Sequence, residues 1–331
     1  MQLRSVSIVG GGAWGTALAQ TLAYNGTSVT MWAHEPEIVD DINARHVNRV
    51  FLPGIELSPS IRATSDLPSI ANGDVILAVP PAQHLRSVIG KLARHLRTDV
   101  PVVICSKGIE QATGKFMGEV LEDVAPQVQC AVLSGPSFAA DVARGLPSAL
   151  TFACRNERVG RHLTTALSSR QMRLYWSSDV IGAELGGSVK NVLAIAAGIV
   201  QGRGLGTSAH AALVTRGFAE LRRFGEAMGA RAETLLGLSG LGDLILTCGS
   251  AQSRNMSLGR ALGEGRSLSE TLGTRSAVTE GIYTAAALVR LAHEKGVEMP
   301  IAEAVYSIVE GQLGVDEAIT ALMQRPLKAE D

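Results

Sequence analysis

The chain has 331 residues, about twice the usual length of one domain, so two hydrophobic cores are expected. Hydrophobic residues make up 46% and charged residues 18%, a balance typical of chains that fold compactly. Thirty basic residues against 31 acidic ones give a net charge of −1, which excludes the overall positive field of a protein that binds nucleic acid or an anionic membrane surface.

Four cysteines lie far apart, with no C-x-x-C pair and no histidine at zinc-ligand spacing, which predicts reduced thiols and no bound metal. The apolar stretch near the N-terminus stops at three glycines, before it reaches the roughly 7–15 residues of a secretory signal. No run of about 18 apolar residues without a charge would span a membrane. We therefore expect a cytoplasmic protein that contacts neither nucleic acid nor membrane.

From residue 3 to about 176, short β-branched runs alternate with amphipathic stretches, which is typical of a parallel sheet with crossover helices. The four clearest strands are Val6–Val9, Val29–Trp32, Val75–Val79 and Val102–Cys105. Three further strands follow at short spacing, which predicts antiparallel additions to the sheet. They are Ala131–Leu133, Ala149–Ala153 and Leu174–Trp176. Ligands are expected at the loops that follow the strands.

After residue 178 helical periodicity takes over, which predicts an all-α second domain. The expected fold is α/β, with an N-terminal doubly wound sheet with extra strands over residues 1–178 and a helical domain over residues 179–331. The first long helix is expected at Val180–Val200. Glycine inside a helix costs up to ~1 kcal/mol relative to alanine, so its glycines predict close backbone approach to a neighbour or a ligand. They are Gly182, Gly186, Gly187 and Gly198.

A G-x-G-x-x-G motif, made by Gly10, Gly12 and Gly15, follows the first strand and precedes a helix pattern that begins near Ala13. The first glycine permits a tight turn, the second lets the backbone approach a pyrophosphate, and the third lets helix and strand touch. The N–H groups of the helix N-terminus then face the anion. The motif predicts a dinucleotide site, with a ligand-free glycine turn as the alternative.

The second strand is followed by His34 and Glu35, about 20 residues after the glycine loop, where an acidic residue reads the ribose of a dinucleotide. Glu35 would accept a hydrogen bond from a ribose hydroxyl, whereas His34 would contact a 2′-phosphate. This position therefore does not choose between NAD and NADP.

Lys190 and Asn191 lie in the middle of the apolar helix Val180–Val200, where an unpaired ammonium would be costly. Asp243, in the glycine-rich stretch G-L-S-G-L-G-D-L, is the expected partner. The functional interpretation makes Lys190 the proton donor to a carbonyl that receives hydride, because burial brings the pKa of a catalytic lysine to about 7–8. The alternative is an ion pair that only stabilises the fold.

Two segments at the expected ligand edge of the sheet carry polar groups. Lys107, in S-K-G-I-E, follows a buried strand, although a lone lysine is also common on a surface. The stretch S-G-P-S-F-A, residues 134–139, offers backbone N–H groups and the Ser137 hydroxyl, and it would also serve as a plain turn. Both segments are candidate substrate contacts.

Two polar segments in the helical half complete the candidate site. Ser253, Arg254 and Asn255 follow the second glycine-rich stretch, and an arginine between a hydroxyl and an amide suits a phosphate. A surface arginine is the alternative. Thr279 and Glu280 begin another helix, where they would either reach a cofactor ribose or cap the helix.

The chain resembles the bacterial NAD(P)-dependent sn-glycerol-3-phosphate dehydrogenase family over nearly its whole length. The segments that carry the resemblance are, in order, G-G-G-A-W-G-T-A-L-A, S-K-G-I-E, G-P-S-F-A, V-K-N-V-L-A-I-A-A-G, G-L-G-D-L-I-L-T-C, S-R-N and V-T-E-G. The resemblance implies that NADH or NADPH reduces dihydroxyacetone phosphate, a small-molecule substrate, to glycerol 3-phosphate for phospholipid synthesis. It also implies a Rossmann-like first domain and a helical second domain, and we expect a homodimer.

The resemblance assigns residues by matching position. Lys190 is similar to the general acid and base of the family. Substrate contacts would come from Lys107, Gly135, Ser137, Lys190, Asp243, Ser253, Arg254 and Asn255. Cofactor contacts would come from Ala13, Trp14, His34, Lys107, Ala139, Arg254, Val278 and Glu280. They add to Gly10, Gly12 and Gly15, which the glycine motif itself assigns to the cofactor.

The sequence departs from the family pattern at two places. Ala209 and His210 stand where polar residues of the asparagine, threonine and lysine type are expected. Ala13 stands where some relatives carry serine, so one hydroxyl near the pyrophosphate is lost. Neither departure removes a proposed catalytic group.

Two rival functions share some of these features. A related reductase of a 2-keto or 3-hydroxy acid would share the glycine loop and the Lys190–Asn191 pair, but it leaves the S-R-N segment unexplained. A regulatory protein that senses a dinucleotide would have no need for an intact Lys190 and Asp243.

Overall fold

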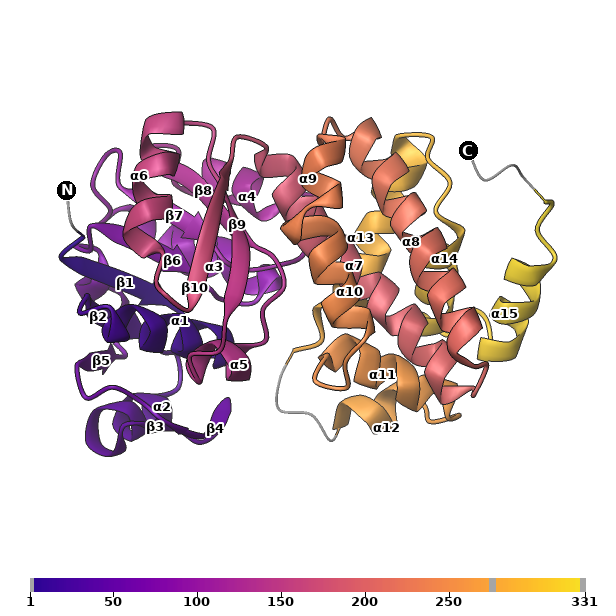
Figure 1. The fold of residues 1–331 in the computed structure, drawn as a ribbon, viewed down its shortest axis with the longest axis horizontal. Coiled ribbons are helices and arrows are strands. Elements are labelled where there is room, and N and C mark those ends of the chain that lie inside the picture. Colours follow the sequence, from indigo (N-terminus) through magenta and orange to yellow (C-terminus); the bar gives the residue numbers. More distant parts are fainter. Residues whose placement is uncertain (1–2, 274–277, 328–331) are drawn as a thin grey trace.

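The computed structural model describes residues 3–273 and 278–327. A sheet flanked by helices, coloured indigo to magenta in Figure 1, lies beside a bundle of helices coloured coral to yellow. The chain passes from the first part to the second between β10 (Met172–Ser177) and α7 (Val180–Gly202). The predicted fold class is confirmed: a Rossmann-like α/β part precedes a part that is helical over its described residues.

Eight strands form one sheet in the order β10-β9-β8-β7-β6-β1-β2-β5. Their bounds are β1 Ser5–Val9, β2 Ser28–Trp32, β5 Ile61–Thr64, β6 Val75–Ala78, β7 Pro101–Ile104, β8 Gln129–Ser134, β9 Ser148–Ala153 and β10 Met172–Ser177. The four clearest predicted strands coincide with β1, β2, β6 and β7, because these runs are buried and rich in β-branched residues. The chain leaves β1 first toward β2 and later toward β6, so the crevice of a doubly wound sheet lies at the carboxyl end of β1.

The directions of the last three strands differ in part from the prediction. β8 runs parallel to β7, because α4 (Met117–Val124) provides a helical crossover between them. β9 runs antiparallel to β8 across a short connection that holds only α5 (Ala139–Ala143). β10 pairs parallel with β9 through the crossover helix α6 (Glu157–Leu167). The antiparallel addition is therefore correct for β9 against β8 and wrong for the pairing of β8 with β7 and of β10 with β9.

The sequence did not predict β5, nor the separate hairpin of β3 (Val47–Asn48) and β4 (Leu52–Glu56). In β5, Arg62 and Thr64 alternate with buried residues, so this short edge strand lacks a continuous apolar run. The hairpin has a first strand of only two residues, and its second strand contains the exposed Pro53 and Gly54, which are rare inside strands. In Figure 1 it lies with α2 (Pro36–Asp40) at the lower left, below the sheet.

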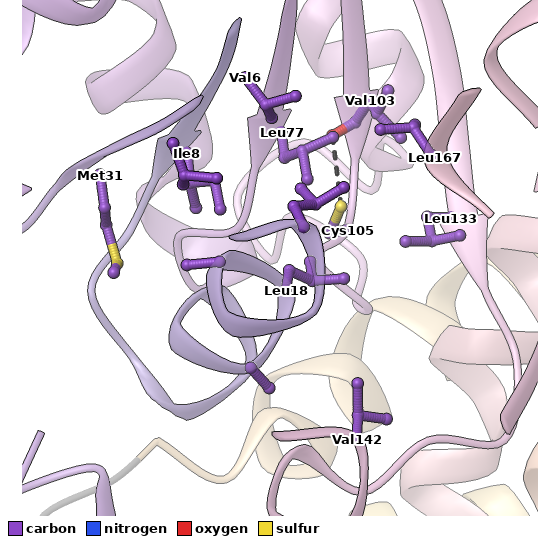
Figure 2. Packing of buried hydrophobic residues seen from close by; sticks show 14 of the residues in the cluster. Val6, Ile8, Leu18, Met31, Leu77, Val103, Cys105, Leu133, Val142 and Leu167 are labelled. Atoms are coloured by element: carbon purple, nitrogen blue, oxygen red, sulfur yellow. Dashed lines mark hydrogen bonds between the residues drawn. The ribbon is translucent and has the colours of Figure 1, made fainter. Parts of the chain in front are cut away.

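Hydrophobic cores cover both faces of the sheet. On one face, Val6, Leu77 and Val103 of neighbouring strands belong to one cluster with Leu18 of α1 (Ala13–Tyr24) and lie on the strand side of it in Figure 2. On the other face, α3 (Ala82–Ala93) and α4 pack against side chains from the same strands. The sheet is therefore a rigid platform, and its strand ends hold the loops that follow them.

α7 runs through the helical part and matches the predicted helix Val180–Val200 with one further half turn. By length and composition α7 alone among the described helices would be able to span a membrane, but 94% of its most apolar stretch is buried inside the protein. It is therefore a core helix. The other helices here are α8 Thr207–Ala227, α9 Ala232–Leu236, α10 Asp243–Cys248, α11 Arg254–Gly263, α12 Leu268–Gly273, α13 Glu280–Glu294, α14 Pro300–Val309 and α15 Val315–Met323.

Two of the predicted glycines of α7, Gly186 and Gly198, lie where another backbone approaches the helix, whereas Gly182 and Gly187 lie against side chains. A Cβ at Gly186 would collide with the carbonyl of Ser239, and one at Gly198 with the carbonyl of Met256 on α11. The approach is mutual, since a Cβ at Gly259 of α11 would collide with the α7 backbone at Ile195. α7 and α11 therefore pack backbone against backbone.

This packing predicts opposite effects for two glycine-to-alanine changes. Gly259→Ala should lower the free energy of unfolding by ~1–3 kcal/mol, because its Cβ has no room. Gly90→Ala, on the exposed side of α3 where the nearest atoms lie at 4.0 Å, should raise it by ~0.5–1 kcal/mol. Thermal unfolding followed by circular dichroism measures both changes. A Gly259→Ala protein as stable as the native chain would contradict the packing.

Candidate active site

Loops that carry predicted site residues meet at one edge of the sheet. β1, β2, β7 and β8 run in the same direction, so the residues that follow them share the carboxyl edge. These residues are Gly10, His34, Lys107 and Gly135. The backbone N–H of Gly10 also donates a 2.9 Å hydrogen bond to the carbonyl of Trp32, which ties the glycine loop to the end of β2.

The three motif glycines have distinct physical roles. Gly10 has a φ of +124°, a conformation that favours glycine, and a Cβ at Gly15 would collide with the Gly10 carbonyl. A Cβ at Gly12, the residue before α1, would meet no described atom within 4 Å. Gly12 therefore borders open space in front of a helix N-terminus, the arrangement that a pyrophosphate needs.

Asp243 lies between two lysines at the junction of the sheet and the helices. Its Oδ1 accepts a 2.6 Å hydrogen bond from Lys190 Nζ, and its Oδ2 accepts one of 2.7 Å from Lys107 Nζ. Asp243 is fully buried, and Lys190 is only 7% exposed. The ion pair that the sequence predicts between Lys190 and Asp243 is present, and Lys107 joins it from the sheet.

Lys190 uses two of its three N–H donors in hydrogen bonds to other side chains of the protein. One bonds Asp243 and the second donates to Thr247 Oγ1 at 2.8 Å, so the third is left for a substrate as far as the described residues go. Burial lowers the pKa of Lys190 to about 8, although the charge of Asp243 opposes this shift. Sequence reasoning missed Thr247, which the four-residue spacing from Asp243 on α10 could have indicated.

Side chains from two helices, α3 and α7, bind the loop that carries Lys107. Arg86 of α3 binds Glu110, a buried residue of this loop, through Nε–Oε1 and Nη2–Oε2 contacts of 2.9 Å each. Ser188 of α7 donates a 3.1 Å hydrogen bond to the Gly108 carbonyl. Sequence reasoning missed Arg86 and Glu110, even though Glu110 is the last residue of S-K-G-I-E.

The fold already uses much of the hydrogen-bonding capacity of Ser253 and Asn255. Ser253 caps α11 by accepting a 3.2 Å bond from a backbone N–H of its first turn. Asn255 donates from Nδ2 to Asn191 Oδ1 at 2.9 Å and accepts from Gly281 N at 3.0 Å. The two residues flank Arg254 at the start of α11, and their contacts fix the position from which Arg254 extends.

Glu280, at the start of α13, connects the two parts of the chain. Its Oε1 accepts a 2.9 Å hydrogen bond from the backbone N–H of Ala82, the first residue of α3. Burial raises the pKa of Glu280, while this hydrogen bond and the charge of Arg254 lower it. Arg254 and Glu280 therefore act on each other electrostatically, and α3, α11 and α13 converge on the site.

Several buried polar atoms here have no hydrogen-bond partner within the described part of the chain. Buried polar atoms are normally paired, so such atoms indicate where a ligand or water binds. Those at the site are Trp14 Nε1, Ser134 Oγ, Thr279 Oγ1, Glu280 Oε2 and Thr284 Oγ1. Together with the open space at Gly12, they fit a polar dinucleotide. No cluster of three histidine, cysteine, aspartate or glutamate side chains that could hold a metal occurs in residues 3–273 and 278–327.

The remaining predicted cofactor contacts lie around this edge with less contact to other groups. His34 is exposed, with its ring centroid 6.1 Å from that of Trp32, and Glu35 directly precedes α2. Ala139 begins α5, and Val278 is half-buried just before α13. Neither His34 nor Glu35 is bound in a way that decides between NAD and NADP.

The S-G-P-S-F-A turn is built around Gly135. Its φ of +138° favours glycine, and its carbonyl accepts from Lys107 Nζ at 2.9 Å and from Ser137 Oγ at 3.2 Å.

His210 is one of the residues at which the sequence departs from the family pattern. Its Nε2 donates a 2.9 Å hydrogen bond to the Cys248 carbonyl. The ring of His210 therefore joins α8 to the end of α10.

Comparisons with known proteins agree with this site over both parts of the chain. The family models for the NAD-dependent glycerol-3-phosphate dehydrogenase N-terminus and C-terminus match residues 5–160 and 179–320. The chain belongs to the NAD-dependent glycerol-3-phosphate dehydrogenase family.

Relatives within this family are similar over their full length. A glycerol-3-phosphate dehydrogenase [NAD(P)+] of Parvibaculum lavamentivorans is 59% identical over 99% of this chain and 98% of its own. One of Caulobacter vibrioides is 54% identical over 100% of both chains. The crystal structure of glycerol-3-phosphate dehydrogenase from Coxiella burnetii superposes with a TM-score of 0.93 at 38% identity, over 98% of this chain and 99% of the other.

Membership of the glycerol-3-phosphate dehydrogenase family establishes the reaction. The chain is an NAD(P)-dependent oxidoreductase that interconverts dihydroxyacetone phosphate and sn-glycerol 3-phosphate, as the resemblance of its motifs implied. Its partner in this reaction is a small-molecule substrate. The family and the activity predicted from the sequence are therefore confirmed.

Proposed function

We propose that Lys190 is the general acid and base of this dehydrogenase and that the phosphate of the substrate binds beside it. The observation that carries the proposal is the buried Lys190–Asp243–Lys107 cluster, which lies at the same sheet edge as the glycine loop. Carbonyl reduction needs a proton donor next to a hydride donor. The carboxyl edge of the sheet provides a place for both, with Lys190 as the proton donor and the glycine loop as the site of the hydride-donating cofactor.

Proton transfer follows from the hydrogen bonds of Lys190. The nicotinamide of bound NADH or NADPH supplies hydride to the carbonyl carbon of dihydroxyacetone phosphate. Lys190 Nζ donates its third proton to the carbonyl oxygen, which becomes the secondary hydroxyl of glycerol 3-phosphate, and its charge stabilises the developing alkoxide. Asp243 and Thr247 hold Nζ in place, and in the reverse direction neutral Lys190 accepts the proton.

Positive charge at the site suits a phosphorylated substrate. Arg254 extends from the N-terminus of α11, where its guanidinium fork and the helix N–H groups both attract a phosphate. Lys107 adds a second positive charge from the sheet. The remaining substrate contacts of the proposal are Gly135, Ser137, Asp243, Ser253 and Asn255.

The cofactor lies along the carboxyl edge of the sheet in this proposal. Gly10, Gly12, Ala13 and Gly15 hold its pyrophosphate at the N-terminus of α1. The contacts with the rest of the dinucleotide are Trp14, His34, Lys107, Ala139, Arg254, Val278 and Glu280. The orphaned Trp14 Nε1 and Glu280 Oε2 support two of these contacts.

The proposal extends to the setting of the enzyme. Glycerol 3-phosphate is a backbone for phospholipids, so we place the enzyme in phospholipid synthesis, in the cytoplasm and as a homodimer. We also retain the division into a dinucleotide-binding domain, residues 1–178, and a substrate domain, residues 179–331. Residues 1–2 and 328–331, at the outer ends of these ranges, lie outside the described residues.

A spectrophotometric assay tests the activity directly. When purified protein is mixed with dihydroxyacetone phosphate, the absorbance of NADH or NADPH should fall as the cofactor is oxidised. Comparing the kinetics with NADH and with NADPH shows which cofactor is preferred. Pyruvate and ketopantoate, which lack the phosphate, should give no consumption. Oxidation with ketopantoate and none with dihydroxyacetone phosphate would favour the rival keto-acid reductase.

Variants of Lys190 and Arg254 separate proton transfer from phosphate binding. Lys190→Ala should lower kcat by ~10²–10⁴-fold while NADH binding is retained, because only the proton donor is lost. Arg254→Ala should raise the KM for dihydroxyacetone phosphate by ~10–100-fold, because a charged hydrogen bond is lost. Steady-state kinetics and NADH titration measure these effects. Equal and mild effects of both changes would contradict the assigned roles.

The pKa of Lys190 near 8 predicts opposite pH profiles for the two directions. Reduction needs the protonated lysine, so kcat/KM for dihydroxyacetone phosphate should be level below pH 8 and fall about tenfold per pH unit above it. Oxidation needs the neutral lysine, so kcat/KM for glycerol 3-phosphate should rise up to that pH and then level off. The residual activity of Lys190→Ala should show no inflection near pH 8. If the inflection persisted in this variant, the titrating group would not be Lys190.

A further inference from the structure

We propose that Asn48, on the β3–β4 hairpin, is a positioning residue that holds the glycine loop in its cofactor-binding conformation. The proposal rests on the cofactor site proposed above for this loop. Asn48 is far from the loop in sequence and lies in a hairpin that sequence patterns did not predict. Its side chain is nevertheless fully buried against the loop, at 0% exposure.

The amide of Asn48 makes three hydrogen bonds in this arrangement. Nδ2 donates 2.8 Å hydrogen bonds to the Gly11 carbonyl and to Thr16 Oγ1, and Oδ1 accepts a 3.0 Å bond from Phe51 N. Both N–H donors and one acceptor position are therefore in use. The amide joins three separate elements: the hairpin, the glycine loop and α1.

The bond to the Gly11 carbonyl determines where the next N–H points. The carbonyl of Gly11 and the N–H of Gly12 belong to one planar trans peptide unit, in which they point in opposite directions. Because Asn48 holds the carbonyl toward the protein interior, the Gly12 N–H points away, toward the open space in front of α1. Asn48 thereby aims a donor at the pyrophosphate position.

Thr16 extends the same effect by one residue. Its Oγ1 accepts from Asn48 and donates a 2.9 Å hydrogen bond to the Gly12 carbonyl. The Gly12 carbonyl also accepts the helical hydrogen bond from Thr16 N at 3.0 Å, and it shares a peptide plane with the Ala13 N–H. The Thr16 hydroxyl therefore reinforces the direction that the helix gives this second donor. Asn48 orients the Gly12 N–H directly and supports the Ala13 N–H through Thr16.

A nearby asparagine provides a matched control. Asn43 precedes the same hairpin, and its amide makes two hydrogen bonds of 2.8 and 2.9 Å with the backbone of Ala63 on β5, away from the glycine loop. Asn48→Ala should raise the Kd for NADH about tenfold, which corresponds to 1.4 kcal/mol. Asn43→Ala should leave this Kd unchanged, although it also removes two hydrogen bonds. Fluorescence titration with NADH measures both values without reference to activity.

Hydrogen exchange gives a second readout of the coupling. NADH should increase the protection of amides in residues 47–56 of the native enzyme, because ligand and hairpin stabilise the same loop and coupling is reciprocal. This increase should be lost in Asn48→Ala and retained in Asn43→Ala. If Asn48 had a purely structural role, Asn48→Ala would lower the Tm of the free protein, but NADH would still increase the protection of these amides.

A pair of threonine variants tests the relay if Asn48→Ala does not fold. Thr16→Val keeps the side-chain shape and removes the hydroxyl, so it should weaken NADH binding, whereas Thr16→Ser should restore it. Thr21→Val is the control, because Thr21 Oγ1 donates its 3.0 Å hydrogen bond to the Ala17 carbonyl within α1. Equal NADH affinity of Thr16→Val and Thr21→Val would overturn the proposal.

The outcomes also separate this inference from the proposed cofactor site. If the native chain does not bind NADH, the site itself is wrong. If it binds NADH and Asn48→Ala binds it equally well, or if Asn43→Ala weakens binding to the same extent, the site stands and the positioning role of Asn48 is refuted. A selective loss in Asn48→Ala supports both.

Discussion

The carboxylate of Asp243 binds two ammonium groups that come from different parts of the fold. Lys107 reaches it from the end of β7, and Lys190 reaches it from the middle of α7. A buried charge that loses one partner typically costs ~3–5 kcal/mol, so this cluster strongly favours one arrangement of the sheet edge against α7. The position of Lys190, the proposed proton donor, relative to the glycine loop depends on that arrangement. A single carboxylate thus links the edge of the sheet to α7.

The cluster forms only because α7 comes unusually close to the sheet. A Cβ at Gly187 would lie 2.6 Å from Ser134 Oγ and 3.3 Å from the Lys107 side chain, so a larger residue would push α7 away from both. The neighbouring Gly186 permits the same approach on the side of Ser239. The cost of two glycines in a helix is balanced by contacts that no other residue would allow. α7 therefore connects the site to the helical core through its backbone.

Much of the site consists of groups that are already bonded to the protein. Asn255 is held by Asn191 and Gly281, Ser253 caps α11, and Asn48 holds the glycine loop. A site held in this way does not need to reorganise when charge develops on the substrate, and reorganisation is the main cost of electrostatic stabilisation. Two atoms left without partners, Trp14 Nε1 and Glu280 Oε2, belong to residues that the proposal assigns to the cofactor.

The sequence alone determined the features that follow from local pattern and simple chemistry. The glycine loop after a strand indicated a dinucleotide, and a lysine in an apolar helix required a carboxylate partner, which is Asp243. Only the tertiary structure decided that Lys107 shares this carboxylate from 136 residues away. It alone also placed Thr247 against Lys190, Glu110 against Arg86 and Asn48 against Gly11. It also decided the direction of β8. These features depend on distances between segments remote in sequence, which no local pattern of hydrophobicity or charge encodes.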